Sequence, residues 1–105
     1  MPFREFRDQG QAREMAARIK AARRRVDIAV AFGKAVKIRR VEVGISQEAL
    51  ADKAGFARSF LSGIELGTKM PTTMSVWRLA QALDCAPSDL WLTAERLFHE
   101  GAGKP

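Results

Sequence analysis

Apolar residues recur at three- and four-residue intervals along most of this chain, which is the spacing of one face of an α-helix. Near the N-terminus the pattern predicts a basic helix over residues 11–25 with a stripe of small and apolar residues, namely Ala12, Met15, Ala16, Ile19, Ala22 and Val26. Asp27 can accept the free backbone N–H groups of a helix start, so a second helix is expected over residues 28–43. Gly44 is a suitable residue to end it.

Two short helices follow, each with a clear start or stop residue. The Ser46 hydroxyl can cap a helix of about eight residues, which stops at Gly55 because a residue without Cβ permits a left-handed turn. A further helix begins after two or three residues and ends at Gly67. Its inward face is predicted to consist of Ala57, Leu61 and Ile64.

Two more helices complete the pattern. Pro71 interrupts helical structure, and Thr72 starts a new helix. The apolar face of this helix is Val76, Leu79, Ala80 and Leu83. Pro87 suits the first turn of the last helix, whose apolar stripe is Leu90, Trp91, Ala94, Leu97 and Phe98. Because this stripe is larger than one small core needs, we expect it to form a dimer interface. No segment alternates with a period of two, so an all-α fold is expected.

Charge adds a partner to this picture. The chain has 105 residues, 18 Lys and Arg against 12 Asp and Glu, and a net charge of +6, which favours a polyanion. Residues 1–27 carry net +4, residues 28–69 net +3 and residues 70–105 net −1. The basic face therefore belongs to the N-terminal two thirds.

Other chemistry is sparse. One cysteine, Cys85, and one histidine, His99, cannot build a disulfide within the chain or the usual structural zinc clusters. No nucleophile, base and metal cluster can be assembled, so we expect no enzymatic activity and no cofactor. No apolar run reaches the roughly 18 residues of a membrane span, and no signal peptide is recognised, so we expect a cytoplasmic protein that makes no use of a membrane.

The segment from Ser46 to Gly67 contains two short helices joined by a tight turn, with the small Ala51 where they would cross, and this is the pattern of a helix-turn-helix. Its second helix can enter the major groove of double-stranded DNA, which is about 12 Å wide. The expected base-reading residues are Arg58, Ser59, Ser62 and Gly63, of which Arg58 can bond bidentately to guanine. The expected phosphate contacts are Ser46, Gln47, Thr68 and Lys69.

These residues resemble the Cro and phage-repressor (XRE-type) helix-turn-helix family. The resemblance covers residues 28 to about 92 and rests on the stretches 32–40, 44–51, 58–67 and 79–83 together with Gly55 and Pro71. It implies a five-helix lambda-repressor-like domain, a recognition helix at 57–66, and a homodimer on a palindromic operator. Within the family, the run from Arg58 to Glu65 is most similar to the controller proteins of restriction-modification systems.

The resemblance also implies an ion pair between Arg40 and Glu65 that sets the angle of the recognition helix. The chain departs from the family in three respects. Ala57 stands where a capping Ser, Thr or Asp is usual, and Leu66 replaces a polar or basic residue beside the phosphates. The third departure is the additional N-terminal segment of residues 1–27.

We therefore expect three parts: a basic extension at 1–27, helical or partly disordered, a DNA-binding domain at 28–98, and a flexible tail at 99–105. The expected function is that of a bacterial or phage-type transcription regulator. The alternative is an antitoxin- or antiactivator-like module that keeps the fold and holds another protein through its N- or C-terminal helix. The run Arg23 to Arg25 can follow DNA phosphates, enter a minor groove, remain a solvated arm or belong to a dimer-forming helix.

Overall fold

The computed structural model describes the backbone of residues 2–101 and the side chains of residues 10–22 and 27–101. Five α-helices run in the order α1 (Pro2–Val43), α2 (Gln47–Ala54), α3 (Arg58–Leu66), α4 (Thr73–Ala82) and α5 (Pro87–His99). Residues 2–101 contain no strand, and the predicted all-α fold is confirmed. The expected tail at 99–105 lies largely outside the described residues.

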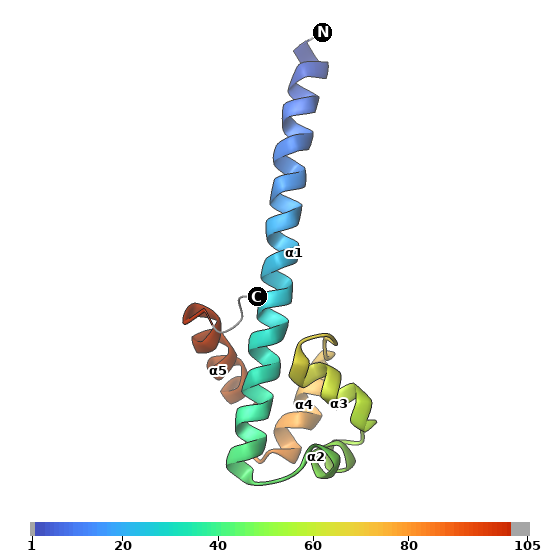
Figure 1. Cartoon of the computed structure of the whole chain (residues 1–105), viewed down its shortest axis with the longest axis vertical. Helices are drawn as coiled ribbons and strands as arrows, with labels where there is room; N and C mark the ends of the chain where they lie inside the picture. The colour runs from blue at the N-terminus through green and yellow to red at the C-terminus, as the bar shows by residue number, and fades with distance from the viewer. Residues whose placement is uncertain (1, 102–105) are drawn as a thin grey trace.

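The first helix differs from the prediction, because α1 is one continuous helix of 42 residues and Asp27 does not begin a second one. The residues around Asp27 are mainly Ala, Arg, Ile and Val, and no Gly or Pro lies between Gly10 and Gly33. Nothing there favours a break strongly enough to outweigh continued helical hydrogen bonding. The predicted basic helix is therefore the outer part of α1, which projects away from the other helices (Figure 1).

The inner part of α1 lies between α5 on one side and α3 on the other (Figure 1). Every helix contributes at least one side chain to a single core, whose largest fully buried members are Phe32, Val36, Leu50, Leu61, Ile64, Leu79, Leu83 and Leu90. The predicted apolar face of α4 is buried throughout, and so is Ala51 on α2. Ala57 is exposed, contrary to the predicted face, because it precedes α3 as its N-cap.

The predicted start and stop residues are confirmed from Gly44 onward. The Ser46 hydroxyl accepts the backbone N–H of Ala49 at 3.0 Å, and Thr72 caps α4 in the same way. Gly55 and Gly67 end α2 and α3 with φ values of +76° and +80°, a left-handed conformation that a side chain would strain.

Two of the residues expected at a dimer interface are buried in the core of the single chain. Leu90 and Ala94 are buried where α5 packs against α1. An apolar stripe on one helix shows that a partner surface exists, but it does not show whether that surface is in the same chain. The side chains of Trp91, Leu97 and Phe98 remain partly exposed. The centroids of the Trp91 and Phe32 rings lie 4.7 Å apart.

Candidate nucleic-acid interface

The outward surface of α3 begins with two polar residues. Arg58 and Ser59 occupy its first two positions and are exposed, while Ser62, one turn later, is half-buried. Their short or hydrogen-bonding side chains keep this end of α3 slim, which is what entry into a major groove requires. The base-reading role expected for these three residues therefore remains a prediction that fits their positions.

Gly63 lies elsewhere, because it is buried beneath the loop that follows α3. A Cβ at Gly63 would lie 2.4 Å from Cγ of Lys69, so a larger residue would force the Lys69 side chain to shift. Burial leaves Gly63 little surface to offer a base. Its role in the structure is to leave space for the Lys69 side chain to pack against α3.

The loop after α3 is tied back to the helix that precedes it. The Thr68 hydroxyl and the Lys69 backbone N–H both donate to the carbonyl of Gly63, at 3.3 and 3.1 Å. Both residues remain exposed. A cationic side chain is thereby held beside α3, as expected of a phosphate contact.

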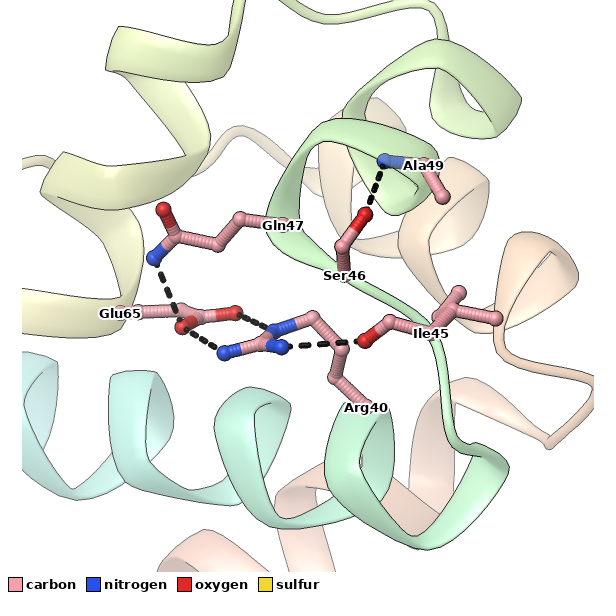
Figure 2. A network of polar contacts seen from close by, with 6 residues as sticks. All are labelled: Arg40, Ile45, Ser46, Gln47, Ala49 and Glu65. Carbon is pink, nitrogen blue, oxygen red and sulfur yellow. Dashed lines mark hydrogen bonds and ion pairs between the residues drawn. The ribbon is translucent and has the colours of Figure 1, made fainter.

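The orientation of α3 depends on the buried carboxylate of Glu65. The Arg40 guanidinium donates to both of its oxygens, from Nε at 2.7 Å and from Nη2 at 3.1 Å (Figure 2). The pKa of Arg40 is raised, mainly by this hydrogen bonding, so its positive charge is secure. Nη1 of the same group donates to the carbonyl of Ile45 at 3.0 Å. The pair implied by the family resemblance is present, and it links α1, the α1–α2 loop and α3.

Gln47 has a position that the sequence did not predict. Its Nε2 donates to Oε1 of Glu65 at 3.0 Å, so the amide joins the start of α2 to the end of α3 (Figure 2). A phosphate contact by the Gln47 side chain would compete with this bond or use its remaining amide hydrogen. The first backbone N–H groups of α2, next to Ser46, have no partner within the helix and suit an anion independently of that side chain.

Gly33, which belongs to the stretch that resembles the family, has a positioning role that the sequence did not predict. A Cβ at Gly33 would lie 2.2 Å from the carbonyl oxygen of Ile64 and 2.7 Å from that of Glu65, so α1 and α3 cross in close contact here. Arg40 follows Gly33 by two turns on the same face of α1. The available signal was a glycine within a helical pattern at this spacing from the arginine.

Two of the three departures from the family lie on either side of α3. Ala57 gives α3 no side-chain cap, and Leu66 is 69% exposed at its end. The side chains of Arg23 to Arg25 lie outside the described residues. Among the described residues, no cluster of His, Cys, Asp and Glu could hold a metal ion, and no helix could cross a membrane.

Comparison with known proteins gives consistent matches over the body of the chain. A sequence profile of a family described as helix-turn-helix matches residues 36–90. An uncharacterized HTH-type transcriptional regulator of Sinorhizobium fredii is 37% identical over 51 residues, which are 49% of this chain and 66% of that protein. A competence pilus inhibition repressor of Acinetobacter baylyi is 33% identical over 70 residues, covering 67% of this chain and 64% of that protein. The chain thus spans slightly less than two thirds of both curated relatives.

Solved structures agree in fold. The restriction-modification controller protein of Aeromonas hydrophila is 37% identical and superposes with a TM-score of 0.58, covering 59% of this chain and 94% of that one. The clp gene regulator of Corynebacterium glutamicum has a TM-score of 0.69 at 23% identity, covering 71% of this chain and 80% of that one, which shows a likeness of fold. The family match begins at residue 36, so it does not include the outer part of α1.

Proposed function

Because this chain belongs to the helix-turn-helix family, we propose that it is a sequence-specific transcriptional regulator that binds a palindromic operator in double-stranded DNA as a homodimer. The observation that carries the proposal is the fixed position of α3. Its polar outer end is exposed, while its other end is held through Glu65 by donors from α1 and α2. A rigidly held helix can present the same side chains to every operator.

In this proposal, Arg58 reads a guanine, and Ser59 and Ser62 contact neighbouring base edges. A bidentate Arg–guanine contact contributes about 1–3 kcal/mol of discrimination. Lys69, Thr68 and the start of α2 at Ser46 and Gln47 contact phosphates, which set the register without reading sequence.

The second copy is proposed to bind where α1 and α5 leave an apolar depression. It is lined by Ile28, Ala31, Trp91, Ala94, Glu95, Phe98 and His99 and has a volume of about 330 Å³. Of the five predicted interface residues, Trp91, Ala94 and Phe98 line this depression, and Leu97 is also partly exposed. A twofold arrangement would place two α3 helices about 34 Å apart, one turn of DNA.

The proposal is tested by selecting bound sequences from random duplexes and measuring the mass of the free and bound protein. A palindromic consensus bound by two copies is the expected result. Arg58→Ala should weaken consensus binding far more than binding to unrelated DNA, whereas Lys69→Ala should weaken both alike and reduce the salt dependence. Equal losses on both DNAs for Arg58→Ala would contradict its base-reading role.

A second candidate is the protein-interaction module, in which the fold holds another protein in place of DNA. The exposed Leu66 beside the loop is the observation in its favour. A protein with no affinity for any duplex at low salt would support it.

In the first proposal the chain acts in the cytoplasm on the bacterial nucleoid and carries out no catalytic step.

A further inference from the structure

The outer part of α1 has an apolar stripe that no described residue covers. All described side chains from residue 11 to residue 22 are exposed, including Met15 at 64% and Ile19 at 48%. Ala12, Ala16 and Ala22 continue the stripe at three- and four-residue spacing, on one side of the helix. A neighbouring helix could approach closely over these alanines, because they have almost no side chain.

The stripe continues the face of α1 that binds α3. Ile19 and Val30 are separated by eleven residues, about three turns, so they lie nearly in line along the helix. At Val30 this face receives the end of α3, since a Cβ at Gly67 would lie 2.7 Å from Val30 Cα. The same face is therefore covered by a helix in the body and left open in the projecting part.

Positive charge flanks the stripe. Residues 10–22 contain Arg13, Arg18 and Lys20 against Glu14 alone, and Glu14 is already paired with Arg18. An acidic helix would meet complementary charge along this surface. A second copy would bring like charges together, and a parallel copy would also meet α3, which occupies this face from Val30 onward.

We propose that residues 12–22 of α1 form a docking surface for an amphipathic helix of another protein, with an apolar stripe and acidic flanks. Met15 and Ile19 provide the apolar contacts, the alanines allow close packing, and the basic residues select an acidic partner. This site is separate from the DNA-binding surface on α2 and α3 (Figure 1). It does not depend on the proposed DNA-binding function.

The experiment uses the full-length protein and two synthetic three-heptad peptides with Leu at positions a and d. One peptide carries Glu at positions e and g, and the matched peptide carries Lys there. Fluorescence anisotropy should show binding of the acidic peptide only, with affinity falling as salt is raised. The double variant Met15→Gln/Ile19→Gln keeps helix-forming residues and the net charge, and should weaken binding by about tenfold or more.

Leu92→Gln is the control, because Leu92 is 62% exposed on α5, away from the stripe. It should bind the acidic peptide as the parent does. Both this control and the double variant should bind operator DNA as tightly as the parent. Equal binding of the two peptides, or unchanged binding by the double variant, would overturn the proposal. Loss of dimerisation in the double variant would assign the stripe to a second copy, and loss of operator binding would assign it to DNA, each overturning the proposal.

Discussion

Removing the Arg40 guanidinium beside Glu65 should lower the free energy of unfolding by more than the number of lost hydrogen bonds suggests. In Arg40→Met, the Glu65 carboxylate, whose side chain is 3% exposed, keeps only the bond from Gln47. Leaving a buried charge without its partner typically costs about 3–5 kcal/mol. Because the Gln47 donor remains, we expect a loss in the lower half of that range in the free energy of unfolding, measured by urea denaturation.

The double variant Arg40→Met/Glu65→Leu should recover most of this stability, since replacing a whole buried pair by apolar residues is often neutral. Its affinity for the selected operator should stay below that of the parent, because α3 is no longer bonded to α1 and the α1–α2 loop. This outcome would separate the orientation of α3 from the stability of the fold. Both quantities are measured on the same preparations, by denaturation and by DNA titration.

A matched control is provided by Arg96 and Glu100, an exposed pair at 3.7 Å within one helix and its cap. Arg96→Met should change stability by less than about 0.5 kcal/mol. The reasoning fails if Arg40→Met is equally mild. It also fails if the double variant is as unstable as the single one, because the loss would then not arise from an unpaired charge.

Three further changes have defined outcomes. Gly33→Ala should lower the free energy of unfolding by about 1–3 kcal/mol and weaken operator binding, because the new Cβ would collide with two backbone carbonyls. The control Gly10→Ala has nothing within 4 Å of its Cβ and should slightly raise stability. Equal effects of the two changes would contradict the close crossing of α1 and α3. Ala57→Ser should add about 1 kcal/mol through a new cap on α3, and Ser46→Ala should lose a similar amount, both read as shifts in denaturation midpoint. Burial raises the pKa of the Cys85 thiol, so alkylation of the folded protein should begin at a higher pH than alkylation of the unfolded protein. Identical pH profiles of alkylation would refute the shift. Because the folded state retains this proton to higher pH, the associated stability is lost as pH rises through the folded pKa.

The sequence was most informative where local chemistry decides the structure. The ends of α2 and α3 follow from Ser46, Gly55 and Gly67, because capping and left-handed turns involve only neighbouring residues. Asp27 was misleading for the same reason: it is able to cap a helix, but the residues on both sides favour continuing one.

The remaining differences are non-local. The partner of Gly33 is the backbone of α3, about thirty residues later, and nothing in the local pattern identifies it. The sequence predicts Leu90 and Ala94 at a dimer interface, but their burial within one chain could not be predicted, because an apolar stripe does not reveal its own partner. For Gln47 the sequence predicts a phosphate contact from its position at the start of α2, and this stays a prediction; the bond from Gln47 to Glu65 could not be predicted, because it required the two helices to be placed in space.

The unbroken course of α1 has a mechanical consequence. From Pro2 to Val43 the helix contains no loop that could act as a hinge, and its rise of 1.5 Å per residue places Ile19 about 20 Å from Gly33, where α3 crosses. The proposed docking surface and the crossing with α3 therefore share a fixed spacing and a fixed rotational angle. Inserting two residues between them would turn one relative to the other by about 200°, and inserting seven would nearly restore the angle while lengthening the rod.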